Sequence, residues 1–183
     1  MRDRRPTAVL ITGAYGAGKT TAAEEIAAVL ERAGVRFAAI DLDWLAWANL
    51  DDHGTEAARI LLENLAAVVG NYRRAGITHV VLAGTVETQA EVDGLQAAIG
   101  SELAVVRLTA PIDIVEARLR THPTSGRQDD LEHARHAIAA GVGASLGHLV
   151  VDGDRPIGEV AGDILDWLGW TPGEDGAAAT MGG

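Results

Sequence analysis

The sequence of 183 residues predicts an α/β protein, a three-layer αβα sandwich in which helices cover both faces of a parallel sheet. Short runs of almost continuously apolar, β-rich residues recur along the chain, and such runs are typical of strands buried on both faces. Longer segments with helical spacing of apolar residues separate these runs, and repeated strand–helix units build a parallel sheet with right-handed crossovers. The predicted strands are residues 8–12, 36–40, 79–83, 103–108 and 148–151.

The predicted helices are bounded by residues that commonly begin or end a helix. Gly34, Gly76 and Gly100 each follow a helical segment, as C-terminal caps do. Pro111 suits the start of a helix because its φ is already fixed, and acidic Asp129 suits a helix N-terminus. The predicted helices are residues 20–33, 55–75, 88–99, 111–120, 129 to about 146, and 156–168.

Composition and charge narrow the classes of function. The 15 basic and 26 acidic side chains give a formal net charge of −11, whereas a nucleic-acid binder carries a basic face. The absence of cysteine rules out disulfides, thiolate metal sites and a cysteine nucleophile. No apolar run approaches the roughly 18 residues of a membrane span, and none before residue 12 is long enough for a signal peptide. We therefore expect a cytoplasmic protein that binds neither nucleic acid nor membrane.

The length suits one domain, which we place over residues 1–170. The segment 171–183 is rich in glycine and alanine and has no core-forming residues, so we expect it to be disordered. The sequence leaves the oligomeric state open.

The strongest functional signal is the pattern G-x-x-x-x-G-K-[ST] over residues 13–20, between a predicted strand and a predicted helix. Glycines in this loop let backbone N–H groups approach phosphate oxygens, and the helix N-terminus adds partial positive charge. Lys19 would reach the β and γ phosphates, and the Thr20 hydroxyl would bind Mg²⁺. Tyr15 lies inside the loop without an assigned chemical role. The expected nucleotide-binding residues here are Gly13, Tyr15, Gly16, Ala17, Gly18, Lys19, Thr20 and Thr21.

Asp41 and Asp43 follow the second predicted strand, at the sheet edge where α/β proteins bind ligands. Alternate residues of an extended chain point to the same side, so we expect both carboxylates to face one site. One would hold a metal-bound water, and the other would orient or deprotonate an attacking hydroxyl. The alternatives are a solvated turn, or Asp43 as the N-cap of a helix that begins at Trp44.

With these motifs, the chain resembles the P-loop kinases that phosphorylate small molecules, a group that includes adenylylsulfate, gluconate, shikimate and chloramphenicol kinases. The resemblance runs from Ala8 to Trp170 and implies a five-stranded sheet in the order 2-3-1-4-5. It also implies ATP and Mg²⁺ as cofactors, a small-molecule acceptor, and a lid over about residues 118–146. The loop after the fifth strand would contact the nucleobase, here with Arg155 and Pro156.

The stretch between the fourth and fifth strands contains Arg118, Arg120 and Arg127. Guanidinium groups stabilise the charge that develops on a transferring phosphoryl group. Arg118 and Arg120 are two residues apart and do not share a helix face, so we favour Arg118, together with Arg127 in the loop 121–128. The alternative is that arginines at a helix C-terminus only complement its dipole.

The third predicted strand ends in Gly84 and Thr85, without the carboxylate of a Walker-B strand, and no Asn-Lys-x-Asp segment is present. Both features argue against ATPase motors and GTPases. Small-molecule kinases of the resembled group can use the acid of the second strand instead, so the resemblance assigns the metal role to Asp41. Gly84 would let the substrate approach the backbone, and Thr85 and Glu87 would hydrogen-bond it. A strand-to-helix turn with a cap is the competing interpretation.

Other side chains carry weaker signals. Trp44 and Trp47 would wall an acceptor pocket, although tryptophan more often packs in a core. Trp167 and Trp170 are expected to pack the last helix. His133 and His136 are interpreted as a surface pair rather than a metal site. The acidic net charge weakly favours a neutral or cationic acceptor.

Taken together, these residues predict an ATP- and Mg²⁺-dependent phosphotransferase that moves the γ-phosphoryl group to a hydroxyl of a small molecule. Asp41 or Asp43 would accept the proton. One alternative is a nucleotide-binding switch without transfer, although such a module does not need two carboxylates beside the phosphates. The other is a nucleoside or nucleotide kinase, which the scarcity of arginines over residues 51–72 disfavours.

Overall fold

The computed structural model describes residues 6–48, 55–120 and 127–170, with the backbone alone over 127–130. The tail predicted to be disordered and most of the predicted lid loop, residues 121–126, lie outside the described residues. No helix in the described part of the chain is long and apolar enough to cross a membrane.

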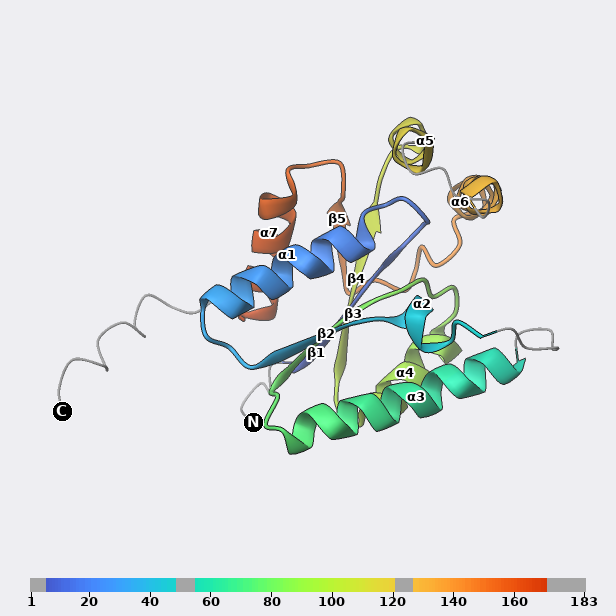
Figure 1. Cartoon of the computed structure of the whole chain (residues 1–183). Coiled ribbons are helices and arrows are strands. Elements are labelled where there is room, and N and C mark those ends of the chain that lie inside the picture. Colours follow the sequence, from blue (N-terminus) through green and yellow to red (C-terminus); the bar gives the residue numbers. More distant parts are fainter. Residues whose placement is uncertain (1–5, 49–54, 121–126, 171–183) are drawn as a thin grey trace.

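Five parallel strands form one sheet in the order β2-β3-β1-β4-β5, which confirms the predicted fold class (Figure 1). The central strand β1 pairs on both sides, with Ala8 opposite Val80 and Leu103. The strands are β1 (Ala8–Gly13), β2 (Phe37–Asp41), β3 (His79–Ala83), β4 (Leu103–Thr109) and β5 (Leu149–Asp152).

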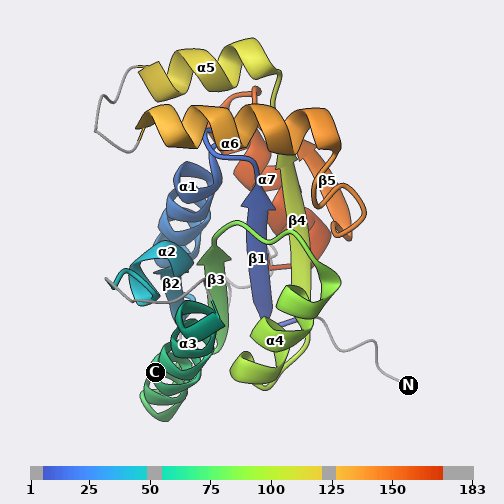
Figure 2. The ribbon, with the colours of Figure 1, turned by 90° about the vertical axis from the view of Figure 1, so that its right-hand side faces the viewer.

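The helices form two layers and a cover. α1 (Lys19–Arg32) and α7 (Ile157–Leu168) lie on one face of the sheet, and α3 (Thr55–Arg74) and α4 (Gln89–Ile99) lie on the other. α5 (Ile112–Arg120) and α6 (Arg127–Ala140) lie side by side over the carboxyl ends of the strands (Figures 1 and 2). The short α2 (Leu42–Leu45) follows β2 directly.

Two helices depart from the predicted boundaries. α6 ends at Ala140 rather than near residue 146, because Gly141 and Gly143 adopt positive φ and turn the chain. The short α2, an alternative expected to begin at Trp44, begins at Leu42, since the Asp41 side chain caps it by accepting the N–H of Asp43. Asp41, and not Asp43, is therefore the N-cap, and the chain is not extended between the two acids.

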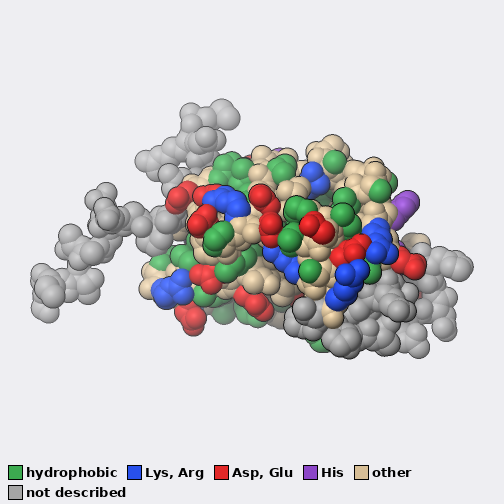
Figure 3. All heavy atoms as spheres, turned by 90° about the horizontal axis from the view of Figure 1, so that it is seen from above, with side chains coloured by type: hydrophobic (Ala, Val, Ile, Leu, Met, Phe, Trp, Pro, Cys, Tyr) green, Lys and Arg blue, Asp and Glu red, His purple; other side chains and the backbone are tan. Residues whose placement is uncertain are grey.

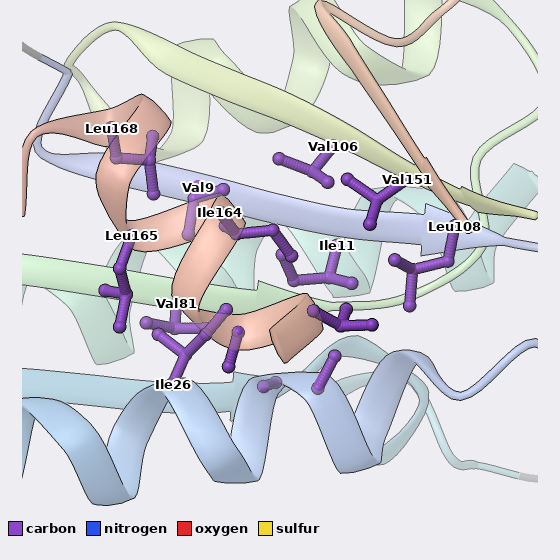
Figure 4. Packing of buried hydrophobic residues seen from close by; sticks show 14 of the residues in the cluster. Val9, Ile11, Ile26, Val81, Val106, Leu108, Val151, Ile164, Leu165 and Leu168 are labelled. Atoms are coloured by element: carbon purple, nitrogen blue, oxygen red, sulfur yellow. The ribbon is translucent and has the colours of Figure 1, made fainter. Parts of the chain in front are cut away.

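The core has two halves, one on each face of the sheet. Strand residues such as Val9, Ile11 and Val106 pack against Ile26 of α1 and Ile164 of α7 (Figure 4). The alternate strand residues, among them Leu10, Leu82 and Val105, pack against Leu65 of α3 and Leu95 of α4.

Trp170 is buried in the first half and donates its indole N–H to the Pro6 carbonyl at 2.8 Å, as expected for packing of the last helix. Trp167, in contrast, is 42% exposed.

Candidate functional site

The loop between β1 and α1 has the shape that its glycines permit. Gly13 has φ +144°, and a Cβ there would collide with the carbonyl oxygen of Leu108. Gly16 has φ +77°, and a Cβ there would lie 3.1 Å from both Val115 and Leu119 of α5. Only glycine combines these φ values with such close neighbours. The predicted phosphate loop therefore packs tightly against β4 and α5.

Lys19 opens α1 and is the only lysine of the chain. Its side chain is buried, and its ammonium donates to the carbonyls of Gly13 and Ala14, each at 3.1 Å. The same nitrogen lies 5.1 Å from the centre of the Tyr15 ring. Tyr15 in turn packs beside a small cluster that includes Val115 of α5. The cation is thus held in the curve of the loop, and Tyr15 connects that loop to the covering helices.

Thr20 and Asp41 meet beside the loop. The Thr20 hydroxyl donates to one Asp41 carboxylate oxygen at 3.2 Å, and the other oxygen accepts the Asp43 N–H at 3.0 Å. This hydroxyl–carboxylate pair has the hard oxygen atoms that Mg²⁺ prefers. Asp43 lies in the first turn of α2, so the expectation that both acids point to one side of an extended strand was wrong. No cluster of three or more His, Asp or Glu in the described ranges forms a metal site by itself.

Arg118 joins three segments of the chain. One guanidinium nitrogen lies 3.4 Å from the Gly16 carbonyl and 3.3 Å from that of Ala17, and the other donates to Gly153 at 2.9 Å. The second nitrogen also lies 3.7 Å from the carboxylate of Asp154. An arginine of α5 therefore connects the phosphate loop with the loop after β5.

The other predicted lid arginines differ from Arg118. Arg120 points to a different side, where it pairs with Glu116 at 2.8 Å, and Arg135 pairs with the same carboxylate at 2.6 Å. Basic and acidic side chains lie next to one another in the view from above (Figure 3). Arg127 was expected in a loop, but it is the first residue of α6, and its side chain lies outside the described part.

Arg155 of the predicted nucleobase loop forms ion pairs with α7. Arg155 pairs with Asp163 at 2.6 Å and with Glu159 at 3.1 Å. The hydrogen bond to Asp163, followed by that to Glu159, raises the pKa of Arg155. Pro156 is the N-cap of α7. In this arrangement the guanidinium of Arg155 lies on the surface of α7.

Two neighbouring cavities occur at the carboxyl edge of the sheet. The smaller, of about 260 Å³, lies beside the phosphate loop and the ends of β3 and β4, and its lining includes Thr12, Gly13, Thr85, Glu87, Arg107 and Gly143. The larger, of about 470 Å³, lies between α2, α3 and α4, and its lining includes Asp43, Leu61, Leu62, Thr85, Glu91 and Leu95. Because Thr85 lines both cavities, the two spaces adjoin at the end of β3.

The structure sorts the predicted acceptor residues. Asp43, Thr85 and Glu87 line the cavities. Trp44 and Trp47 do not; they are 70% and 75% exposed, and their ring centres lie 4.8 Å apart.

Gly84 does not leave room for a substrate at its backbone, because a Cβ there would lie 2.7 Å from the Leu42 side chain of α2. The competing interpretation of this turn is confirmed in part, since Thr88 and Glu91 form a capping box at the start of α4.

Sequence reasoning missed Arg107, which lines the smaller cavity. The signal was a single charge inside the apolar run of residues 103–108.

None of the histidines in the described ranges, which are His79, His133, His136 and His148, lines either cavity. His133 and His136 are exposed, as expected. His79 is at the opposite edge of the sheet, where burial lowers its pKa. Its ring lies 4.7 Å from Trp170 in an edge-to-face arrangement.

No protein-family model and no curated protein sequence matches this chain. Solved structures do match it over most of its length. A sugar kinase from Janibacter sp. HTCC2649 is 20% identical, with a TM-score of 0.61 over 90% of this chain and 95% of that one. A shikimate kinase from Bacteroides thetaiotaomicron is 19% identical, with a TM-score of 0.61 over 89% and 98%.

The Mycobacterium tuberculosis APS kinase, solved in complex with AMPPNP and APS, is 21% identical, with a TM-score of 0.57 over 90% and 98%. The chain therefore has the fold of the P-loop small-molecule kinases.

Proposed function

We propose that this protein is an ATP-dependent kinase that phosphorylates a hydroxyl group of a small molecule. The observation that carries the proposal is the position of Lys19, Thr20 and Asp41 around one phosphate-binding loop, directly beside two cavities. A kinase needs a held triphosphate and an adjoining space for the acceptor, and this edge of the sheet offers both. The structural similarity to a sugar kinase, a shikimate kinase and an APS kinase supports the same proposal.

The nucleotide half of the site uses the loop, Lys19 and Arg118. Backbone N–H groups of the loop and the N-terminus of α1 attract the phosphates. Lys19, which donates to the Gly13 and Ala14 carbonyls in the structure, would exchange these bonds for phosphate oxygens. Arg118 already contacts the loop and lies at its outer side, where a guanidinium stabilises phosphate charge.

Thr20 and Asp41 are the residues that would hold a magnesium ion, because their oxygen atoms converge at 3.2 Å beside the phosphate loop. Protein sites for Mg²⁺ often supply only one or two oxygen ligands and leave the rest to substrate phosphates and water. When bound, the ion neutralises charge on the β and γ phosphates.

In the proposed transfer, the acceptor hydroxyl oxygen forms a bond to the γ-phosphorus, and the bond from that phosphorus to the β–γ bridging oxygen breaks. The bridging oxygen keeps the electron pair and leaves as part of ADP. We assign Asp43 as the base that takes the hydroxyl proton, because Asp41, which pairs with the Thr20 hydroxyl, is assigned to the magnesium ion. Asp43 also lines the larger cavity, where an acceptor would lie.

The test follows transfer of labelled γ-phosphate from ATP to a panel of hydroxylated small molecules, with nucleotide binding measured separately. Lys19→Met should lower transfer by about 10²–10³-fold, and Asp43→Asn by about 10²–10⁴-fold without loss of nucleotide binding. The matched control is Asp93→Asn, because Asp93 is exposed on α4 and lines neither cavity. Full activity of Lys19→Met would reject the proposal. Nucleotide binding without transfer to any member of the panel would favour a binding module instead.

A further inference from the structure

Arg107 is a basic residue inside an apolar segment of β4. It lies opposite Thr12 of β1 and Val150 of β5, and the other residues of the segment 103–108 are buried and apolar. Gly147 packs against its stem, since a Cβ there would lie 3.0 Å from the Arg107 Cβ. The side chain is partly buried and lines the smaller cavity together with Thr85.

Two polar atoms in the lining of this cavity have no partner in the described part of the chain. These atoms are Nε of Arg107 and Oγ1 of Thr85, and both are buried. The Arg107 side chain forms no hydrogen bond or ion pair among the described residues, although the chain has 26 acidic side chains. Glu87 lines the same cavity but forms no ion pair with Arg107.

The other arginines whose side chains are described behave differently, because each donates at least one hydrogen bond. These are Arg32, Arg36, Arg59, Arg73, Arg74, Arg118, Arg120, Arg135 and Arg155. Arg107 is the exception among the described arginines, and it is also the arginine that lines the smaller cavity.

A buried guanidinium nitrogen without a partner is costly, since water is removed from that atom and nothing in the described part of the protein replaces it. Proteins keep such groups mainly where a ligand supplies the missing partner. The planar guanidinium forms two parallel hydrogen bonds with an oxyanion, and a threonine hydroxyl adds a third donor. Arg107 and Thr85 therefore match a carboxylate or a phosphate ester more closely than a neutral group.

We infer that the acceptor carries an oxyanion, a carboxylate or a phosphate ester, and that Arg107 and Thr85 bind it. This inference rests on the proposed function, because it describes the acceptor of the same reaction. Gly13 lines the same cavity, so an acceptor anchored at Arg107 presents its far end to the phosphate loop. The local cation outweighs the acidic net charge, which is screened beyond about 8–10 Å and had favoured a neutral or cationic acceptor.

The experiment measures binding of matched acid and neutral probes by calorimetry, with ADP present at saturation so that anions do not occupy the phosphate loop. The pairs are D-gluconate with D-glucitol and D-glycerate with glycerol, and glycerol 3-phosphate serves as the phosphate ester. The wild type should bind at least one acid about tenfold more tightly than its neutral counterpart. The carboxylates and the ester distinguish the two oxyanions.

Arg107→Met should remove the preference for the acid, and Thr85→Val should weaken it several-fold. Arg59→Met is the matched control, because Arg59 is exposed and paired with Glu63 on α3, and it should leave the preference unchanged. Without any ligand, Arg107→Met should melt at the same temperature as the wild type or higher, since the removed group has no partner to lose.

Three outcomes would overturn the inference: a wild type that prefers none of the acids, an Arg107→Met variant that keeps the preference, or one that melts lower or does not fold. The last result would assign Arg107 to the stability of β4. ADP binding by the wild type and by Arg107→Met, measured in the same series, tests the nucleotide site independently. Failure of the oxyanion site is thereby distinguished from failure of the proposed kinase.

Discussion

The two faces of the sheet are filled to different extents. On the α1/α7 face, apolar side chains pack directly between sheet and helices (Figure 4), and no residue of α1 or α7 lines either cavity. On the α3/α4 face, the larger cavity lies between α2, α3 and α4. Thr85, whose hydroxyl has no partner among the described residues, lies where the two cavities adjoin. Both faces belong to the same five strands.

The difference indicates that the two faces have different roles, one in supporting the phosphate loop and the other in leaving space for a ligand. The α1/α7 face fixes the orientation of α1 on the sheet, and the phosphate loop is held between β1 and that helix. The α3/α4 face leaves the larger cavity, which adjoins the smaller cavity beside the same loop, and the proposed acceptor would bind in this joint space. Dense packing thus supports the part that must be rigid, while incomplete packing leaves room for a ligand.

A truncation on each face tests this contrast directly. Ile164→Ala on α7 removes a fully buried side chain and should lower the free energy of unfolding by about 2–5 kcal/mol. Leu62→Ala on α3 should cost less, because Leu62 is only partly buried and already borders the larger cavity. Urea denaturation of both variants measures the two values. Equal losses would break the comparison.

Two glycines provide a finer test of space. Gly84→Ala should destabilise the protein by about 1–3 kcal/mol, since the new methyl group would overlap Leu42 behind the cavity edge. Gly162→Ala, inside α7, should stabilise it by about 0.5–1 kcal/mol, because no atom lies within 4 Å of the new Cβ and alanine favours a helix. Opposite signs in thermal unfolding are expected. A stable Gly84→Ala protein would show that Leu42 repacks freely.

The smallest expected effect is a change in the pH dependence of stability, and it concerns His79 at the start of β3, on the α1/α7 face. Burial lowers the pKa of His79, which contacts Trp170, so the folded protein holds the neutral imidazole more strongly than the unfolded chain does. The unfolded state therefore binds more protons once pH falls below about 6.5, and stability declines there until the lowered pKa of the folded state is passed. His79→Phe should lose this part of the pH dependence. The readout is the difference in unfolding free energy between wild type and variant at pH 7.5 and pH 5, and identical profiles would contradict it.

Much of the fold follows from local patterns. The strands were predictable because each is a short apolar run, and residues 13–20 because the glycines, Lys19 and Thr20 have fixed spacing between a strand and a helix. The helix ends at Gly100 and before Gly34 followed from backbone preferences of glycine. These features depend on neighbours in the sequence, so no tertiary information was needed.

The site was less predictable because it depends on competition between contacts. The Asp41 side chain caps α2 by accepting the Asp43 N–H. The chain therefore turns into a helix after Asp41, whereas the alternation of residues had suggested an extended conformation. Leu42 then occupies the space beside Gly84, which sequence alone had left for a substrate. The sequence shows that an arginine lies in a strand, but it does not show whether that arginine has a partner. Only the structure shows that the Arg107 Nε is buried without a partner among the described residues. The two cavities were not predictable either, because no pattern of residues in the sequence indicates where a space is left unfilled.

The single lysine of this chain has a practical consequence. Protein grown with isotope-labelled lysine carries one labelled side chain, and that side chain is Lys19, in the curve of the phosphate loop. With the label at Nζ alone, its magnetic resonance spectrum would contain a single signal, and the position of that signal would respond to the charge that the loop holds. Arginine carries the remaining positive charge, so the molecule has a built-in reporter that needs no foreign label.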